Sequence, residues 1–352
     1  MTTYVDIVRF SWGKRVLLLF MFLANSFVIA QETEDESLTV PSEDEIIITA
    51  ERYKPRPTFL ELSYESFQSF FVKAKYQGLT ESAQVEQNLV RKIKFRFPII
   101  LKERMNLIGG FGYRHEQFKF ENQSDPDFPL FVRFEDKPLK QIAFKLYFKK
   151  DLEKDRFLYI YLQSSLNSDV PSFNDLSDQL KLSLTSIYGK YIGPHKSIGY
   201  GISFGYDFGR PAIYPVFILN NNFNLNWGYE LLLPKKAQIR YSPNNSNHFY
   251  TGLEVQGASY NLRNEVLPEF SRLEFRRSSI RALFTYEREV YDWVWVSLKI
   301  GYRYPINIYI SEPRKRRKDA LILLDANGAP YLRFSIFLVP PKVLVDKAKT
   351  SF

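Results

Sequence analysis

An alternating stretch near the middle of the chain constrains the fold more than any other feature. Residues 198–208 read I-G-Y-G-I-S-F-G-Y-D-F, with bulky apolar residues at the even positions and glycine, serine or aspartate at the odd positions. Successive side chains of a strand point to opposite faces, so one face of this strand is apolar and the other is small or polar. About eleven residues tilted by about 45° are enough to cross the hydrocarbon core of a bilayer. The stretch therefore predicts a strand of a transmembrane β-barrel.

The same alternation recurs along the chain, as expected where each strand separates lipid from a lumen. We predict fourteen strands, with twelve as the alternative, at residues 59–76, 84–97, 105–120, 139–149, 156–166, 179–191, 197–209, 214–222, 227–233, 237–242, 248–260, 272–287, 293–304 and 330–339. A soluble secreted β-sandwich also alternates, but its strands are usually about half as long as a membrane crossing requires. The predicted fold class is therefore all-β, an antiparallel transmembrane β-barrel of 12–14 strands.

The first thirty residues have the composition of a secretory signal peptide. Arg9, Lys14 and Arg15 precede an apolar run over 16–23, and Val28-Ile29-Ala30 supplies short residues at a cleavage site. A retained N-terminal anchor is the alternative. We predict four parts: the signal peptide over 1–30, a mobile acidic periplasmic segment over 31–58, the barrel over 59–339 and a C-terminal extension over 340–352. Export and strand-rich alternation together predict the outer membrane of a Gram-negative cell.

The lengths of the connections agree with a barrel whose N-terminus is periplasmic. In such barrels the long loops are extracellular and the short turns are periplasmic. Counting strands up and down places four long connections outside, at 121–138, 167–178, 261–271 and 305–329. It places three short turns inside, at 150–155, 192–196 and 288–292. The region 214–242 is less regular, because its two middle strands are short for a crossing.

Charged residues alternate with apolar ones in several predicted strands, and we assign them to a wet lumen. A lipid-facing Lys or Arg costs about 2–4 kcal/mol at the bilayer midplane, so these side chains should face inward. The predicted luminal charges are Lys92, Lys94, Arg96, Arg281 and Glu287. They favour a channel or transporter for small solutes. A non-conducting surface protein, with a binding or structural role, is the alternative, because a barrel of this size lies between filled eight-strand barrels and open 16-strand porins.

The sequence predicts no catalytic, cofactor or metal site. It has three histidines and no cysteine, which excludes disulfides and leaves no His/Cys cluster with the spacing of metal ligands. We place His195 and His248 in solvated turns, and His115 at the outer end of a strand with no serine nearby. An outer-membrane lipid-modifying enzyme of the Ser/His type is therefore a distant alternative. Trp293 and Trp295 fall on the luminal parity, unless a bulge rotates them into an interfacial aromatic girdle.

The second half of the chain contains short motifs rich in proline, glycine and aromatic residues. They include Phe208-Gly209-Arg210-Pro211, Pro215, Trp227, Leu233-Pro234 and Tyr241, and the last strand begins Ala329-Pro330-Tyr331-Leu332-Arg333. On these residues the chain resembles an uncharacterised outer-membrane β-barrel family of Bacteroidota, a domain of unknown function, over about 59–339. The resemblance implies a barrel in the outer membrane and carries no activity.

Two segments outside the predicted strands indicate partners. The run Arg314, Lys315, Arg316, Arg317 and Lys318 lies in a predicted outer loop, where clustered cations attract lipopolysaccharide phosphates. A solvated loop without a ligand is the alternative. As an outer-membrane barrel, the chain should also contact outer-membrane lipid and the barrel-assembly machinery, and we expect no nucleic acid.

The second segment precedes the barrel and consists of Asp44, Glu45, Ile46, Ile47, Ile48, Thr49 and Ala50. It resembles the energy-coupling box at the start of TonB-dependent receptors. A short β-prone segment can add a strand to the sheet edge of a periplasmic energy-coupling protein. Against this role, too few residues separate the segment from the first strand for a plug domain. A simple tether is therefore the alternative.

Overall fold

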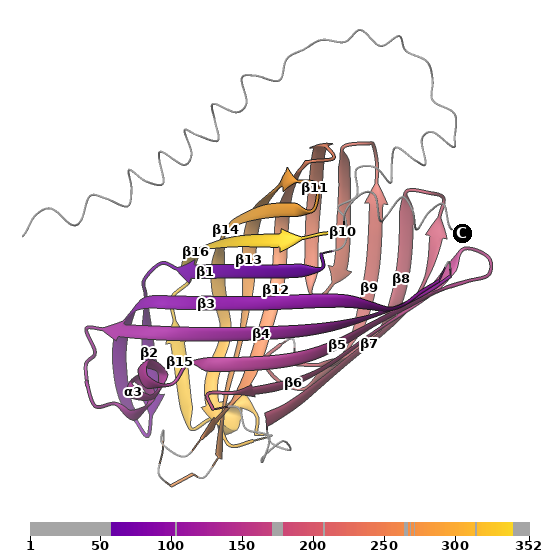
Figure 1. Cartoon of the computed structure of the whole chain (residues 1–352). Helices are drawn as coiled ribbons and strands as arrows, with labels where there is room; N and C mark the ends of the chain where they lie inside the picture. The colour runs from indigo at the N-terminus through magenta and orange to yellow at the C-terminus, as the bar shows by residue number, and fades with distance from the viewer. Residues whose placement is uncertain are drawn as a thin grey trace, which may run out of the picture. The chain divides into compact units, whose positions relative to one another are not determined.

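The computed structural model describes residues 58–340, except 103, 171–178, 207, 264–266, 268, 271 and 314. These residues form a closed antiparallel β-barrel of fourteen strands (Figure 1). The predicted fold class and the first-choice strand number are confirmed. The predicted signal peptide, and residues 31–57 and 341–352 of the predicted flanking segments, lie outside the described residues.

The strands follow one another around the barrel in chain order. Their bounds are β1 (Leu60–Phe67), β2 (Phe70–Tyr76), β3 (Leu79–Lys102), β4 (Met105–Glu121), β5 (Leu139–Leu152), β6 (Arg156–Ser168), β7 (Leu180–Ile192), β8 (Lys196–Gly205), β9 (Ala212–Asn222), β10 (Trp227–Leu233), β11 (Lys236–Asn244), β12 (Asn247–Arg263), β13 (Arg272–Tyr291), β14 (Val294–Ser311), β15 (Ile322–Ala326) and β16 (Ala329–Leu338). An α-helix, α3 (Pro129–Asp136), lies between β4 and β5, and a short 3₁₀ helix, η2 (Arg317–Asp319), precedes β15.

The sixteen labelled strands count as fourteen strands of the barrel, because β1 with β2, and β15 with β16, each form one interrupted strand. β1 and β2 both pair with β3, and β15 and β16 both pair with β14. The register is continuous across both interruptions, since Phe67 lies opposite Tyr331 and Val72 lies opposite Ala326. The barrel closes where β1 and β2 pair with β16 and β15.

The alternation predicted for the central strand is present in β8. Tyr200 and Ile202 point outward and are 67% and 57% exposed, whereas Ser203 and Gly205 face the lumen and are buried. Most other strands likewise expose large apolar side chains on their outer face. We call this outer surface the apolar belt.

Two strands continue past prolines at which we predicted their ends. β3 runs through Pro98 to Lys102, and β14 runs through Pro305 to Ser311. The register shifts beside each proline. A β-bulge leaves one residue without its ladder hydrogen bond, so a strand tolerates proline there. The predicted loop over 305–329 is therefore wrong, because both of its ends are strand and only 312–321 connects them.

The connections sort by length between the two ends of the barrel. The four long ones, 122–138, 169–179, 264–271 and 312–321, all lie at one end, which we call the loop end. The opposite end, the turn end, carries only short turns. This sorting agrees with the alternation expected from the sequence.

The barrel has short strands on one side. β10 has seven residues and β11 has nine, whereas β3 has 24. Past these short strands, on the loop-end side, β6 meets β12 directly. Asn261 forms a parallel bridge with Ser168, and Asn167 Nδ2 donates a hydrogen bond to the carbonyl oxygen of Ser259 at 3.0 Å. The lumen is therefore narrowed toward the loop end.

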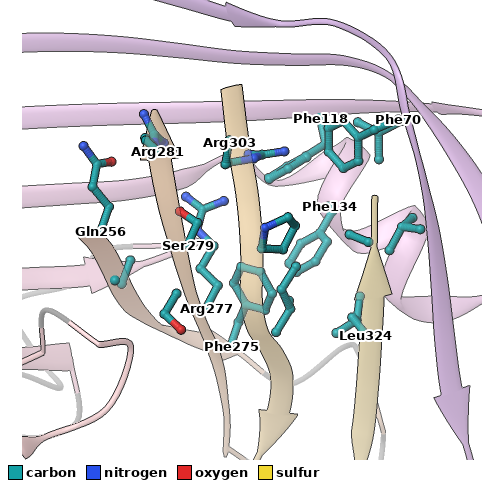
Figure 2. A pocket seen from close by; sticks show the side chains of 18 of the residues that line it. Phe70, Phe118, Phe134, Gln256, Phe275, Arg277, Ser279, Arg281, Arg303 and Leu324 are labelled. Carbon is teal, nitrogen blue, oxygen red and sulfur yellow. The ribbon is translucent and has the colours of Figure 1, made fainter. Parts of the chain in front are cut away.

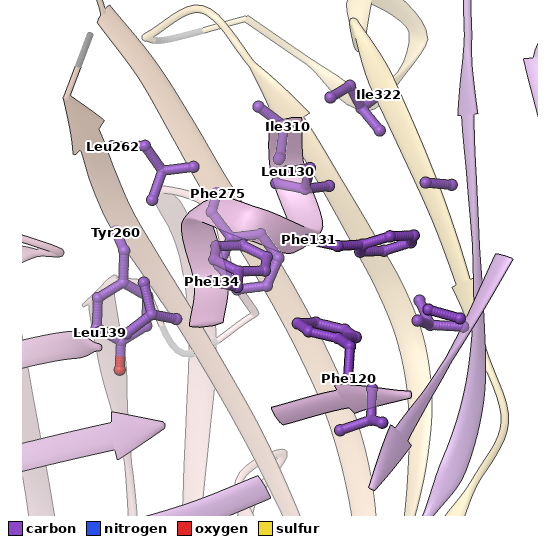
Figure 3. Close-up of a cluster of buried hydrophobic side chains, with 14 of the residues drawn as sticks. Phe120, Leu130, Phe131, Phe134, Leu139, Tyr260, Leu262, Phe275, Ile310 and Ile322 are labelled. Atoms are coloured by element: carbon purple, nitrogen blue, oxygen red, sulfur yellow. The ribbon is translucent and has the colours of Figure 1, made fainter. Parts of the chain in front are cut away.

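The helix α3 fills the lumen at the loop end (Figure 3). Pro129 suits its first turn, where the missing N–H would have no partner in the helix. Leu130 and Phe131 are fully buried, and Phe134 is nearly so. The buried cluster around the helix draws on many strands and includes Phe120, Tyr260, Leu262, Phe275, Ile310 and Ile322. Burial of each large apolar side chain contributes about 1.5–3 kcal/mol, which keeps α3 in this position.

Among the described residues, no helix is long and apolar enough to cross a membrane.

Candidate luminal binding site

A cavity of about 90 Å³ lies in the lumen between α3 and a group of arginines (Figure 2). Its apolar wall includes six phenylalanines, which are Phe70, Phe118, Phe120, Phe131, Phe134 and Phe275. Its polar wall consists of Arg114, Arg277, Arg281, Arg303, Gln256, Ser278 and Ser279. In Figure 2 the labelled phenylalanines and Leu324 lie on one side and Gln256 and Arg281 on the other. The cavity thus joins an aromatic surface to a cationic one.

A bulge in β14 shapes one wall of this cavity. Ser278 pairs with Asn307 and Ser279 pairs with Pro305, so Ile306 is an extra residue on β14. The bulge changes which residues of β14 face inward. Arg303 and Ile308 therefore both line the cavity, although an uninterrupted strand would point them to opposite faces.

Two arginines of the cavity share the carboxylate of Glu116. Arg114 Nη2 lies 2.8 Å from Glu116 Oε2, and Arg277 Nη1 lies 2.8 Å from Oε1. Asn88 Nδ2 donates a third hydrogen bond to Oε1 at 3.0 Å. Glu116 has no exposed surface, so these donors, and not water, stabilise its negative charge.

A second buried carboxylate, Glu65, is shared among three cations. Lys92 Nζ lies 3.3 Å from Oε2, Arg281 Nη1 lies 3.0 Å from Oε1, and Arg333 also pairs with Oε2. Glu65 comes from β1, and its partners come from β3, β13 and β16. Two of the predicted luminal charges, Lys92 and Arg281, therefore meet at one carboxylate that we did not predict.

Arg303 is the remaining arginine of the cavity, and no carboxylate of the described residues pairs with it. Its Nη1 donates a hydrogen bond to the neutral amide oxygen of Asn88 at 3.1 Å. Its guanidinium carbon lies 4.0 Å from the ring centroid of Phe67 and 4.7 Å from that of Phe70. Its Nε is buried and has no hydrogen-bond partner. Arg303 is thus a buried cation held by aromatic rings and one amide.

The other three predicted luminal charges lie nearer the turn end. Lys94 Nζ pairs with Glu61 Oε2 at 2.8 Å, in a setting where the Lys94 side chain is 36% exposed. The guanidinium of Arg96 lies 5.4 Å from the ring centroid of Tyr147. Glu287 lies further along the inner wall, on β13. The Lys94 side chain at this end of the lumen is thus more exposed than Glu65, which has no exposed surface.

Sequence reasoning did not select several charged residues of the site, namely Glu65, Glu116, Arg114, Arg277 and Arg303. Some of them share a parity with small or polar residues, as Glu65 does with Ser63 in β1, so the alternation held a usable signal. Arg303 was placed in a predicted strand, but nothing in the sequence shows that the chain brings it to Phe67 and Phe70.

One histidine differs from its predicted environment. His248 was expected in a solvated turn, but it lies in β12 with 1% of its surface exposed. Its ring stacks on Trp295 at 5.3 Å, and its Nδ1 lies 2.8 Å from Ser242 Oγ. Trp295 is buried on the luminal side, as its parity indicated. The turn before β12 is only two residues long, so the strand begins early enough to include His248.

The contact between Ser242 and His248 does not have the arrangement of a catalytic triad. Both side chains are buried, and the imidazole Nε2 has no hydrogen-bond partner. A triad needs an acid that orients the histidine and a serine that a substrate can reach. In the part of the chain that the structure describes, no group of three His, Cys, Asp or Glu side chains could hold a metal ion.

The two predicted partner segments are only partly described. Lys315, Arg316, Arg317 and Lys318 are exposed at the loop end, and Arg314 lies outside the described residues. Arg276 Nη1 donates to the carbonyl oxygen of Lys315, which fixes the base of this loop. The segment resembling an energy-coupling box, 44–50, lies outside the described residues as a whole.

The chain matches no protein-family model, and no curated protein sequence is similar to it. Among solved structures it is similar to an outer membrane channel from Pseudomonas putida F1, with a TM-score of 0.38 and 10% identity, over 85% of this chain and 100% of that one. It is also similar to the Pseudomonas putida toluene transporter TodX, with a TM-score of 0.34 and 8% identity, over 80% of this chain and 89% of that one. The outer membrane protease OmpT from Escherichia coli gives a TM-score of 0.27 and 11% identity, over 79% and 94%. Similarity at this level concerns the barrel fold and says nothing about activity.

Proposed function

We propose that the protein is a small-solute channel or transporter of the bacterial outer membrane. The apolar belt supports the location, because a soluble protein rarely exposes apolar patches larger than a few hundred Å². Side chains such as Ile213 and Tyr200, which are 71% and 67% exposed, would instead contact lipid. In this proposal the loop end is extracellular and the turn end periplasmic, as is usual for such barrels.

The observation that carries the channel proposal is the charged inner wall. Polar and charged side chains line the lumen from the turn end up to the cavity, and a lumen of this kind admits water and polar solutes. Near the loop end α3 packs against the inner wall, and below it the buried Glu65 and Glu116 occupy the lumen together with their cationic partners. Passage of a solute through that end requires α3 to leave its position.

Single-channel recording in planar bilayers tests this proposal. We expect rare or small conductance steps from the unaltered protein and larger ones from the double variant Phe131→Ser, Phe134→Ser, which weakens the packing of α3. Val132→Ser is the matched control, because Val132 lies on the same helix but is 38% exposed. Absence of steps from both the unaltered protein and the double variant would reject the channel. Heat-modifiable migration on SDS gels verifies that each variant has folded, and a protein that stays soluble without detergent would reject the membrane location.

One observation favours the alternative of a non-conducting binding or structural barrel. Leu130 and Phe131 have no exposed surface, so the loop end is tightly filled in this structure. A barrel that never opens there would bind ligands only from the turn end or through its loops. The recording described above separates the two functions.

The remaining identity and partner proposals rest on sequence alone. Membership of the Bacteroidota family of outer-membrane barrels is supported by the motifs around Trp227 and Tyr241. Those two residues lie opposite each other on β10 and β11, with ring centroids 4.6 Å apart. Binding of lipopolysaccharide phosphates by the loop 315–318 is supported by its exposed cations. Replacing these four residues with glutamine should weaken binding to lipopolysaccharide vesicles, and unchanged binding would reject that assignment.

Energy coupling through residues 44–50 is a separate proposal. Replacing Ile47 with proline removes a main-chain donor from any strand pairing with a periplasmic partner. Crosslinking to that partner should then fall. If the unaltered protein shows no crosslinking, or if the variant crosslinks equally well, the segment is a tether.

A further inference from the structure

We infer that the luminal cavity binds a small organic anion, a carboxylate with an aromatic or short aliphatic body. This inference deepens the proposed function by naming the class of solute, and its role in transport rests on that function. Binding itself can be measured without any conduction.

The charges around the cavity indicate an anion. Four arginines line it, and no carboxylate from the described part of the chain does. The nearby carboxylates already form ion pairs. Glu116 pairs with Arg114 and Arg277. Glu65 pairs with Arg281, Lys92 and Arg333. Buried charges in proteins are normally paired, and an anionic ligand would supply a partner that the described residues do not.

Arg303 is the residue that such an anion would contact. It is 8% exposed, lines the cavity and has only the amide of Asn88 as a hydrogen-bond acceptor. Its Nε is buried and has no hydrogen-bond partner. A guanidinium presents two parallel donors that match the two oxygens of a carboxylate.

The apolar part of the cavity lining indicates that the anion has an apolar body. Six phenylalanines, together with Leu324, Ile308 and Val85, form most of that wall. An inorganic anion would leave these side chains without a partner, whereas a neutral hydrocarbon would leave the arginine side unpaired. The volume of about 90 Å³ is several times the roughly 10–15 Å³ that one water needs, so a small organic molecule is a reasonable size.

Calorimetric titration of the detergent-solubilised full-length protein tests the inference. Benzoate is the probe, benzyl alcohol is its neutral counterpart, and inorganic phosphate is an anion without an apolar body. We expect saturable binding of benzoate and at least tenfold weaker binding of the other two. Equal binding of benzyl alcohol or of phosphate would overturn the inference, as would the absence of saturable binding with both benzoate and hexanoate.

Variants locate the site. Arg303→Gln should weaken benzoate binding at least tenfold, and Arg303→Lys, which keeps the charge but not the planar fork, should weaken it less. Arg96→Gln is the matched control, because Arg96 is also an inner-wall arginine but does not line the cavity. Unchanged binding in Arg303→Gln would overturn the assignment. Binding without conductance would reject the channel and keep the site, whereas conductance without binding would do the reverse.

Discussion

Arg303 lies over the ring of Phe67, with 4.0 Å between its guanidinium carbon and the ring centroid. The two residues come from β14 and β1, at opposite ends of the chain. This cation–π contact partly takes the place of an ion pair with a carboxylate, which other buried cations of the lumen form with Glu65 or Glu116. It makes Arg303 energetically different from Arg281 and Arg333, which both pair with Glu65.

Removing the charge of Arg303 should not destabilise the barrel. Burying a guanidinium without an anionic partner costs several kcal/mol of desolvation. The two cation–π contacts of Arg303 offset this cost by about 1–2 kcal/mol each. We therefore expect Arg303→Met to raise the free energy of unfolding by about 1 kcal/mol in the absence of ligand. Urea unfolding in detergent measures it. A fall in the free energy of unfolding by more than about 2 kcal/mol would show that the protein already offsets the desolvation cost of the Arg303 charge.

Replacing Glu65 with glutamine should have the opposite effect. The change leaves Lys92, Arg281 and Arg333 without their shared carboxylate, and breaking a buried ion pair costs about 3–5 kcal/mol. Glu61→Gln is the control, because its pair with Lys94 is more exposed and should cost about 1 kcal/mol or less. The same urea titration compares them. Equal losses in the two variants would mean that water reaches Glu65.

Gly209 should not tolerate a side chain. Its φ of 76° is in the left-handed region, and a Cβ there would overlap the carbonyl oxygen of Arg277. Gly193 has a similar φ of 66° but open space around it. We expect Gly193→Ala to cost about 1 kcal/mol and Gly209→Ala about 1–2 kcal/mol more, because only the second also displaces the connection 206–211 from β13. Equal losses, measured by thermal melting, would mean that this connection moves aside freely.

An arginine on the apolar belt should reveal whether the belt faces lipid. Ile202 points outward near the middle of β8, and Ile202→Arg should cost about 2–4 kcal/mol when the barrel folds into phospholipid vesicles. Asn220→Arg is the control, because Asn220 shares the inward parity of Tyr214 and Val216 in β9 and is exposed. A negligible effect of Ile202→Arg would contradict the membrane location.

The alternation of residue types predicts which side chains face inward wherever a strand is not interrupted by a bulge. This pattern is local, since the direction of each side chain in a strand follows from its neighbours. It predicts the outward face of β8, whereas the orientation of Trp295 stays open from the sequence, and the lengths of the connections agree with strands that alternate in direction. It fails at Pro98 and Pro305, where proline predicts the end of a strand and the structure forms a bulge instead.

Only the tertiary structure decided which inward side chains meet. Glu65 contacts Arg281 and Arg333, which are 216 and 268 residues away, because β1 closes the barrel against β16 and β13 follows two strands further along the wall. The position of α3 likewise depends on side chains from many strands and not on its own eight residues alone. The sequence by itself determined the faces of the strands, because their period is local. Barrel closure and register determined the cavity and its arginines, because these join residues that are distant along the chain.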